Sequence, residues 1–288
     1  KGINEHAIDI KSLRGALNFK QKFENKLLSI LDEIDANDKN NGGFDVVIGG
    51  AGLSGVEIAA EMASYAKNYL DAALFQNQGV RICLVDGMED ILPGQDPWII
   101  EKSRIQLQKL GVKIMTGEFI KELKPHSLVL QNSQEISYDF FIFTGGTAPS
   151  PLTQNLPFEK AKNGQLAVMS TLQLPQYDTI YAIGDTAYIT DKLEKPLPPT
   201  SQIAKQSAHC AVTNIQRAIK GQTPTVFNGK ILGTMVALGE NYAVGMLQNK
   251  LRVSGRLAYY LKQGIFTHYK LPLWKFARKG FHKKSVHL

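Results

Sequence analysis

The stretch that decides the fold of this chain runs from Val46 to Glu57 and reads Val-Val-Ile-Gly-Gly-Ala-Gly-Leu-Ser-Gly-Val-Glu. A β-branched run leads into three glycines spaced as Gly-x-Gly-x-x-Gly, and an alanine-rich helix is expected to follow. The first glycine permits a tight turn, the second lets backbone amides approach a diphosphate, and the third allows close packing of helix on strand. The start of the helix adds unpaired N–H groups and the positive end of its dipole. The turn therefore predicts a site for the diphosphate of NAD(H), made by Gly50, Gly52, Leu53, Ser54 and Gly55.

The elements around this turn alternate between helix and strand, which predicts an α/β fold with a parallel sheet covered by helices. Leucines and Phe23 recur at three- and four-residue steps in the first expected helix. We expect helices over residues 11–35, 53–75 and 97–110, and strands over residues 45–49, 81–85 and 112–115.

Short strands at residues 127–130 and 136–138 precede a buried-looking run at 140–143, so a β-meander is expected before the last strand of the sheet. A second apolar strand, residues 179–183, ends in Gly184-Asp185, and a helix is expected to open after Thr200. Glycines thus follow two strand ends.

Asp86 directly follows the second strand, where a carboxylate can accept hydrogen bonds from both ribose hydroxyls of an adenosine and would repel a 2′-phosphate. It lies 31 residues beyond Gly55, whereas about 20 beyond the motif is usual. A long first helix and its loop would absorb the difference. The alternative interpretation is an ordinary surface aspartate, but we expect Asp86 to favour NAD(H) over NADP(H).

Glu57 and Asp185 each have two interpretations, one structural and one functional. Glu57 lies in the first turns of the expected helix, where a carboxylate complements the helix dipole by about 0.3–1 kcal/mol; the turn beside it also faces the expected place of a nicotinamide ring. Asp185 has the position of a turn-capping residue. The helix after Thr200 would nevertheless direct its positive end at whatever Asp185 contacts, and a reduced flavin gains from such a dipole.

Composition narrows the function classes. The chain has 288 residues, 43% of them hydrophobic, and a net charge of +7. Its two cysteines form no CxxC pair, so we expect no disulfide framework and no metal site, and a reducing, cytoplasm-facing compartment fits best. Cys83 lies in an apolar run and is expected to be a buried structural thiol. Nowhere do about 18 consecutive apolar residues occur, so no membrane-spanning helix is expected.

The basic charge is concentrated at the C-terminal end, since ten Lys and Arg and no Asp or Glu follow Glu240. Aromatic and aliphatic side chains interleave with them, which predicts that residues 255–288 lie on an anionic membrane surface. The alternatives are a docking helix for a partner protein and a nucleic-acid patch. No nucleic-acid-binding motif accompanies the charge, so we expect no nucleic-acid partner. The apolar members are Tyr259, Tyr260, Leu261, Ile265, Phe266, Tyr269, Leu271, Leu273, Trp274, Phe276 and Phe281.

Four stretches together resemble one family. They are residues 46–57, Phe143-Thr144-Gly145-Gly146, Ala182-Ile183-Gly184-Asp185, and the run Pro199-Thr200-Ser201-Gln202-Ile203-Ala204-Lys205-Gln206. Their order and spacing resemble the type II NADH:quinone oxidoreductases, which are flavoproteins with two dinucleotide-binding domains. The chain resembles the C-terminal two-thirds of these enzymes.

The resemblance implies roles for individual residues. The turn at 50–55 and Asp86 would hold NADH, with Gly145 lining the same site. Gly184 and Asp185 would bind FAD, and the backbone of Thr200, Ser201 and Gln202 would cap the flavin ring, although the family more often has Ala at position 201. Gln202 and Gln206, one helical turn apart and so on one face, match glutamines beside the quinone. Glu57 matches a glutamate near the flavin that handles protons or charge.

The implied organisation is two Rossmann-like dinucleotide-binding domains, of which the NAD domain is complete and the FAD domain only partly present. This chain has no Gly-x-Gly-x-x-Gly before Gly50, and residues 2–7 resemble the crossover that follows the FAD half, so roughly the first hundred residues are expected to be absent. Whether this chain alone retains FAD is left open. The expected segments are a connecting helix (1–40), the NAD(H)-binding domain (41–149), the second half of the FAD domain (150–250) and a membrane-surface segment (251–288).

The implied function is transfer of a hydride from NADH to FAD and then of two electrons to a membrane quinone, without proton pumping. The expected location is peripheral, on the cytoplasmic face of the cell membrane, and a homodimer is left open. Two alternatives remain: another flavoprotein reductase, acting on a disulfide or a ferredoxin, and a non-enzymatic NAD-binding protein of the membrane surface. The second alternative would need Asp86 and the basic tail but neither Gln202 nor Gln206.

Overall fold

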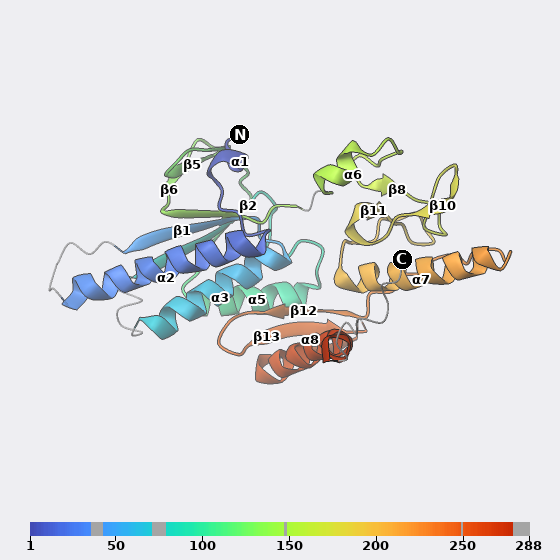
Figure 1. Cartoon of the computed structure of the whole chain (residues 1–288). Helices are drawn as coiled ribbons and strands as arrows, with labels where there is room; N and C mark the ends of the chain where they lie inside the picture. The colour runs from blue at the N-terminus through green and yellow to red at the C-terminus, as the bar shows by residue number, and fades with distance from the viewer. Residues whose placement is uncertain (36–42, 71–78, 147–148, 249, 279–288) are drawn as a thin grey trace. The chain divides into compact units, whose positions relative to one another are not determined.

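The structure is a computed structural model that describes residues 1–35, 43–70, 79–146, 149–248 and 250–278 (Figure 1). The chain forms two compact units. Unit 1 consists of Lys1–Gly145 and Thr234–Leu288, and unit 2 of Gly146–Gly233. Residues 234–250, which we expected in one segment with residues 150–233, thus belong to the same compact unit as the first 145 residues.

Unit 1 is built on a four-stranded parallel sheet in the order β3-β2-β1-β7. The register places Ile48 beside Leu84 on one side and Ile142 on the other. Such strands are buried on both faces, which explains their nearly continuous apolar sequences. The parallel sheet confirms the expected α/β fold. Its strands are β1 (Phe44–Gly49), β2 (Val80–Asp86), β3 (Lys113–Thr116) and β7 (Phe140–Phe143).

Three of the described helices pack on this sheet (Figure 1). They are α2 (Leu13–Asp35), α3 (Leu53–Tyr69) and α5 (Pro97–Lys109). The apolar stripe of α2 includes Phe23 and Leu27, which are buried with Phe44 of β1. Alanines along α3 are completely buried, so this helix approaches the sheet closely. Each helix therefore buries the face that its sequence period predicts. Helix α3 ends at Tyr69; the expected continuation to residue 75 lies outside the described residues.

Two smaller sheets complete unit 1. Strands β4 (Ile120–Leu123), β5 (Ser127–Leu130) and β6 (Glu135–Ser137) form an antiparallel meander, as expected, between β3 and β7. Strands β12 (Gly233–Ala237), β13 (Ala243–Leu247) and β14 (Leu251–Ser254) form the second sheet. Helix α8 (Gly255–Arg278) packs on β13, as does α5 (Figure 1). The first helix, α1 (Ile3–His6), lies beside β4.

Unit 2 has short strands and one long helix, α7 (Ser201–Ile219). Its core gathers around Leu172, Leu174, Ile203 and Ala211. Strand β10 ends at Tyr181, two residues before the expected end, although the N–H of Ala182 still donates to the carbonyl of Leu172, the residue before β9. The remaining elements are α6 (Pro151–Asn155), β8 (Leu166–Ala167), β9 (Gln173–Leu174), β10 (Tyr177–Tyr181), the 3-10 turn η1 (Gly184–Thr186) and β11 (Ala187–Tyr188). Strand β9 pairs with β10 and β8 with β11.

Candidate functional site: a glycine turn in unit 1 and a Gly-Asp turn in unit 2

The glycine turn of unit 1 requires glycine at two positions for different reasons. Gly50 has φ +108°, a left-handed conformation that side chains rarely adopt. A Cβ added to Gly55 would lie 1.8 Å from the carbonyl oxygen of Gly50, so any side chain there would push α3 away from β1. The sequence pattern assigned these same two functions, a tight turn and close helix packing, to these two residues.

Gly52 differs because a Cβ added there would meet no protein atom within 4 Å. The space in front of Gly52 is therefore open, as a site for a bound group must be. Gly52 is also the N-cap of α3, and this helix end has no side-chain cap. Helices α5, α6 and α7 are capped by Asp96, Ser150 and Thr200 respectively. The first N–H groups of α3 have no partner within the helix, and the space in front of the N-cap residue Gly52 is open.

Asp86 lies beside this turn and also accepts a backbone hydrogen bond from it. Its Oδ2 accepts from the N–H of Ala51 at 2.5 Å, and its Oδ1 accepts from the N–H of Met88 at 2.8 Å. The side chain is half-buried. Each carboxylate oxygen accepts more than one hydrogen bond, so the carboxylate keeps capacity for two hydroxyl donors. Asp86 lies at the end of β2, directly beside the turn, which is where dinucleotide-binding folds carry an acid.

Glu57 contacts parts of unit 1 that sequence spacing could not reveal. Its Oε1 accepts from the N–H of Ala237 in β12 at 2.9 Å and forms a short ion pair with Nζ of Lys262 in α8. Lys262 is only 8% exposed, although we counted it among the basic residues of a membrane-facing surface. That interpretation of Lys262 is wrong: a buried ammonium needs a partner, and Glu57 supplies it from 205 residues away.

The carboxylates of Glu57 and Glu61 lie one helical turn apart near Lys262. Burial raises the pKa of Glu61 above its usual range, the charge of Glu57 raises it further, and Lys262 and a hydrogen bond from the backbone of Gly239 oppose the rise. Lys262 thus forms an ion pair with Glu57 and also attracts the carboxylate of Glu61. Elsewhere in this unit, burial raises the pKa of the Cys83 thiol to about 11, which agrees with an unreactive structural cysteine.

The Gly-Asp turn of unit 2 is fixed to α7. Gly184 has φ +60°, and its N–H donates to Oγ of Ser207, which is fully buried on α7. The exposed carboxylate of Asp185 has no hydrogen bond or ion pair within the described parts of the chain. Asp185 therefore does not cap its own turn, which was the simpler interpretation from the sequence.

The two glutamines of α7 lie on one face, as predicted, and both bind backbone. Gln202 donates from Nε2 to the carbonyl of Gly233 at 2.8 Å and accepts from the N–H of Leu232 at 2.7 Å. Gln206 makes the same two bonds with Lys230, at 2.8 and 2.9 Å. Together they hold the extended residues 230–233 along the helix. Each amide retains one N–H and one oxygen lone pair for a further partner.

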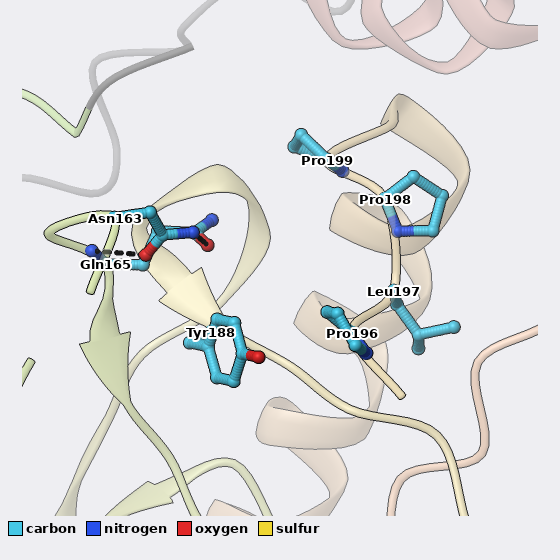
Figure 2. Close-up of a pocket in the computed structure, with 7 residues that line it drawn as sticks. All are labelled: Asn163, Gln165, Tyr188, Pro196, Leu197, Pro198 and Pro199. Carbon is cyan, nitrogen blue, oxygen red and sulfur yellow. Dashed lines mark hydrogen bonds between the residues drawn. The ribbon is translucent and has the colours of Figure 1, made fainter. Parts of the chain in front are cut away.

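A cavity of about 360 Å³ lies in unit 2 next to the start of α7 (Figure 2). Tyr188 and three prolines form its apolar walls, and the amides of Asn163 and Gln165, which hydrogen-bond to each other, form a polar edge. Gln165 also donates to the carbonyl of Asp185. The volume is at the lower end of the range for small-ligand sites. It is large enough for part of a bound cofactor, and the lining residue Pro199 directly precedes Thr200, the N-cap of α7.

Thr200 and Ser201 begin α7, with the Thr200 hydroxyl accepting from the N–H of Ile203 at 3.4 Å. Gly145 follows β7 in unit 1, where a Cβ would meet the ring of Phe143. Leu53 and Ser54 are the first exposed residues of α3. Within the described residues, no cluster of side chains could hold a metal ion, and no helix is both long and apolar enough to cross a membrane.

Sequence reasoning missed two groups at these sites. Lys262 carried no local signal because its partner is distant in the chain. Thr144 was quoted only as part of a motif, yet its Oγ1 donates to the carbonyl of Gly50 at 2.8 Å and lies 3.2 Å from that of Gly49. A hydroxyl directly after the last strand of the sheet, beside a glycine turn, is the signal that could have identified it.

Comparison with known proteins defines the class first. The chain belongs to the pyridine nucleotide-disulphide oxidoreductase family, whose pattern matches residues 5–214. The expectation of a Rossmann-type oxidoreductase fold is thereby confirmed.

The relatives then point to one kind of enzyme within this family. A type II NADH:quinone oxidoreductase of Haemophilus influenzae is 28% identical over 296 residues, covering 95% of this chain and 66% of the relative. One from Staphylococcus aureus is 26% identical, covering 93% of this chain and 66% of the relative. The predicted resemblance to type II enzymes is confirmed, and the chain spans just under two thirds of the length of these relatives.

Solved structures share the fold. NDH2 from Plasmodium falciparum in complex with NADH has a TM-score of 0.80 at 20% identity, covering 93% of this chain and 70% of that one. The sulfide:quinone oxidoreductase of Aquifex aeolicus has a TM-score of 0.70 at 17% identity, covering 96% and 65%. A third neighbour is an FAD-dependent oxidoreductase of the same family from Desulfovibrio vulgaris, with a TM-score of 0.52 at 20% identity, covering 70% and 48%. The cofactors expected from the sequence, NAD(H) and FAD, agree with these names.

Proposed function

We propose that the protein is an NADH:quinone oxidoreductase of type II, that residues 41–145 of unit 1 bind NADH, and that residues 150–233 of unit 2 form part of a flavin site. The observation that carries the proposal is the uncapped start of α3 facing open space at Gly52. An anionic diphosphate would accept hydrogen bonds from the N–H groups at the start of α3. Asp86, already bonded to the turn, would accept from the ribose hydroxyls and exclude a 2′-phosphate.

FAD, when bound, would supply the hydride acceptor and pass two electrons to a quinone. Asp185 and the backbone of Thr200 to Gln202 would hold it, since the cavity residue Gln165 donates to the backbone carbonyl of Asp185 and the cavity residue Pro199 directly precedes Thr200. The remaining N–H of Gln202 and of Gln206 would donate to a quinone carbonyl. Glu57, with Lys262 as its counter-ion, would hold a negative charge near the nucleotide turn.

The membrane would be reached through α8. Beyond Gly264 this helix exposes Ile265, Phe266, Leu271 and Trp274 at 41–53% of their surface, and basic residues accompany them, as expected for a helix in an anionic interface. We place the protein at the cytoplasmic face of the cell membrane, attached peripherally. The first turns of α8 belong to the protein core, because Ala258 and Lys262 are buried.

The activity is tested with the full-length protein. It should carry flavin absorbance and oxidise NADH when a soluble quinone is added, and the absence of either result contradicts the proposal. Activity only with a disulfide or a ferredoxin would favour the alternative reductases. Asp86→Ala should raise the KM for NADH by roughly 10–100-fold, the equivalent of a lost charge-assisted hydrogen bond, with little change in kcat. Asp178→Ala, at a solvent-exposed strand position in unit 2, is the control.

Membrane attachment is tested without removing the buried turns of α8. Phe266→Ser combined with Trp274→Ser should reduce sedimentation with vesicles that contain anionic lipid, whereas Leu193→Ser, at a loop leucine that is 75% exposed, should not. Equal sedimentation of all three proteins would contradict attachment through α8.

A further inference from the structure

Thr144 occupies the space that two glycines leave free. A Cβ added to Gly50 would lie 2.8 Å from Oγ1 of Thr144, and one added to Gly55 would lie 2.7 Å from the same atom. The hydroxyl therefore fills the notch between the turn and the start of α3. The backbone N–H of Thr144 also donates to the carbonyl of Gly49 at 2.8 Å, which fixes the residue at the end of the sheet.

The peptide unit between Gly50 and Ala51 is held from both sides. Its carbonyl accepts from the Thr144 hydroxyl at 2.8 Å, and its N–H donates to Oδ2 of Asp86 at 2.5 Å. A trans peptide directs its carbonyl and its N–H in opposite directions. The orientation set by Thr144 on one side therefore determines the direction of the N–H that the Asp86 carboxylate receives on the other.

We infer that Thr144 is a positioning residue for the adenosine ribose of the nucleotide, acting through the Gly50–Ala51 peptide on Asp86. This inference rests on the proposed nucleotide site and names a residue that it did not include. Without the hydroxyl, the Gly50 carbonyl loses its partner, the peptide gains freedom to rotate, and the Asp86 carboxylate is no longer fixed at the angle that a pair of ribose hydroxyls requires.

The experiment is a binding measurement on the full-length protein, with NADH as the probe and its fluorescence as the signal. Thr144→Val keeps the shape and removes the hydroxyl, and should weaken NADH binding about tenfold, equivalent to about 1.4 kcal/mol. Thr144→Ser retains the hydroxyl and should bind within about twofold of the wild type. Thr213→Val removes a threonine hydroxyl that also bonds a backbone carbonyl, but on α7, and should change nothing.

A double-mutant cycle identifies the route. In an Asp86→Asn background, Thr144→Val should weaken NADH binding much less than in the wild type, because the group that it orients has lost its charge. An equal loss in both backgrounds, or unchanged binding by Thr144→Val, overturns the inference. If the wild type itself binds no NADH, the proposed function fails and the inference with it. A lowered melting temperature in Thr144→Val that Thr144→Ser does not rescue would indicate a merely structural residue and would also overturn it.

Discussion

The turn at residues 50–55 and the turn at Gly184-Asp185 both follow strands, but they are held in opposite ways. In unit 1, the turn at residues 50–55 is held by its own neighbours on several sides, while the helix behind it has no side-chain cap. In unit 2, the Gly184-Asp185 turn is anchored by Ser207, its carboxylate has no partner among the described residues, and the helix beside it is capped by Thr200. Under the proposed function, the first turn would offer backbone N–H groups to an anion, and the second would offer a carboxylate to hydroxyl groups.

The first turn would bind its ligand through backbone groups, whereas the second would bind through one side chain. A backbone site tolerates side-chain changes only where a Cβ has room, whereas a side-chain site depends on one carboxylate. Replacements at the glycines of both turns therefore test the contrast most directly.

The largest effect is expected from Gly55→Ala. Its Cβ would lie 1.8 Å from the carbonyl oxygen of Gly50, so α3 must move and NADH binding should be lost together with several degrees of melting temperature. Gly184→Ala in unit 2 should cost only about 1–2 kcal/mol, the strain of a left-handed residue, because its Cβ would meet nothing closer than 3.3 Å. Gly264→Ala, in open space on α8, is the control. Equal melting temperatures for Gly55→Ala and the control would refute the close packing at the turn.

Gly52→Ala should separate the ligand from the fold. The new methyl group meets no protein atom within 4 Å, so the melting temperature without nucleotide should remain within about 2 °C of the wild type. The same methyl group projects into the space assigned to the diphosphate, and NADH binding should weaken about tenfold or more. Thermal melting without nucleotide checks the first statement and calorimetric titration with NADH checks the second. Wild-type affinity in this variant would remove the diphosphate from this space.

A smaller effect is expected in unit 2 from Gln206→Leu. This change removes two hydrogen bonds to Lys230, each with a net contribution of about 0.5–1.5 kcal/mol, and should loosen residues 230–233. Hydrogen exchange at the amide of Lys230 should accelerate, while the amides of the glycine turn remain unaffected. His209→Leu, at an exposed residue further along the helix, serves as the control. Protection of Lys230 equal to that of the wild type would mean that Gln202 alone holds the segment.

The smallest effect concerns pH. The pKa of Glu61 is raised in the folded protein, chiefly by burial and then by Glu57. A raised carboxyl pKa means that its contribution to stability is present below the unfolded value, near 4.5, and is lost as the pH rises through the folded value. Glu61→Gln should therefore melt slightly higher than the wild type at pH 7 and identically at pH 4. A lower melting temperature at pH 7 would show that the bond to Gly239 dominates.

The sequence predicted the local parts of this structure well. The individual strands and helices, the meander, the left-handed conformation of Gly50 and the close packing at Gly55 follow from patterns that are local in the sequence. The glutamine face of α7 was also predicted correctly, since a spacing of four residues fixes the face of a helix.

What the sequence did not predict depends on partners distant in the chain. Gln202 and Gln206 bind an extended segment that has no periodic pattern of its own. Lys262 looked like one charge of a basic surface because nothing near it signals burial, and the carboxylate that receives it lies 205 residues earlier. Thr144 gains its importance from a carbonyl 94 residues away. Such contacts are products of the assembled fold, not of local preference.

The division of unit 1 into two stretches of chain has a consequence for synthesis on the ribosome. Residues 1–145 emerge first, but the β12–β14 sheet and α8, with Lys262, emerge only after all of unit 2. Domains generally fold in the order in which they are made. Here the unit that starts first is completed last. Glu57 therefore has no counter-ion until residues 234–278 have left the exit tunnel. Unit 2 can fold before then.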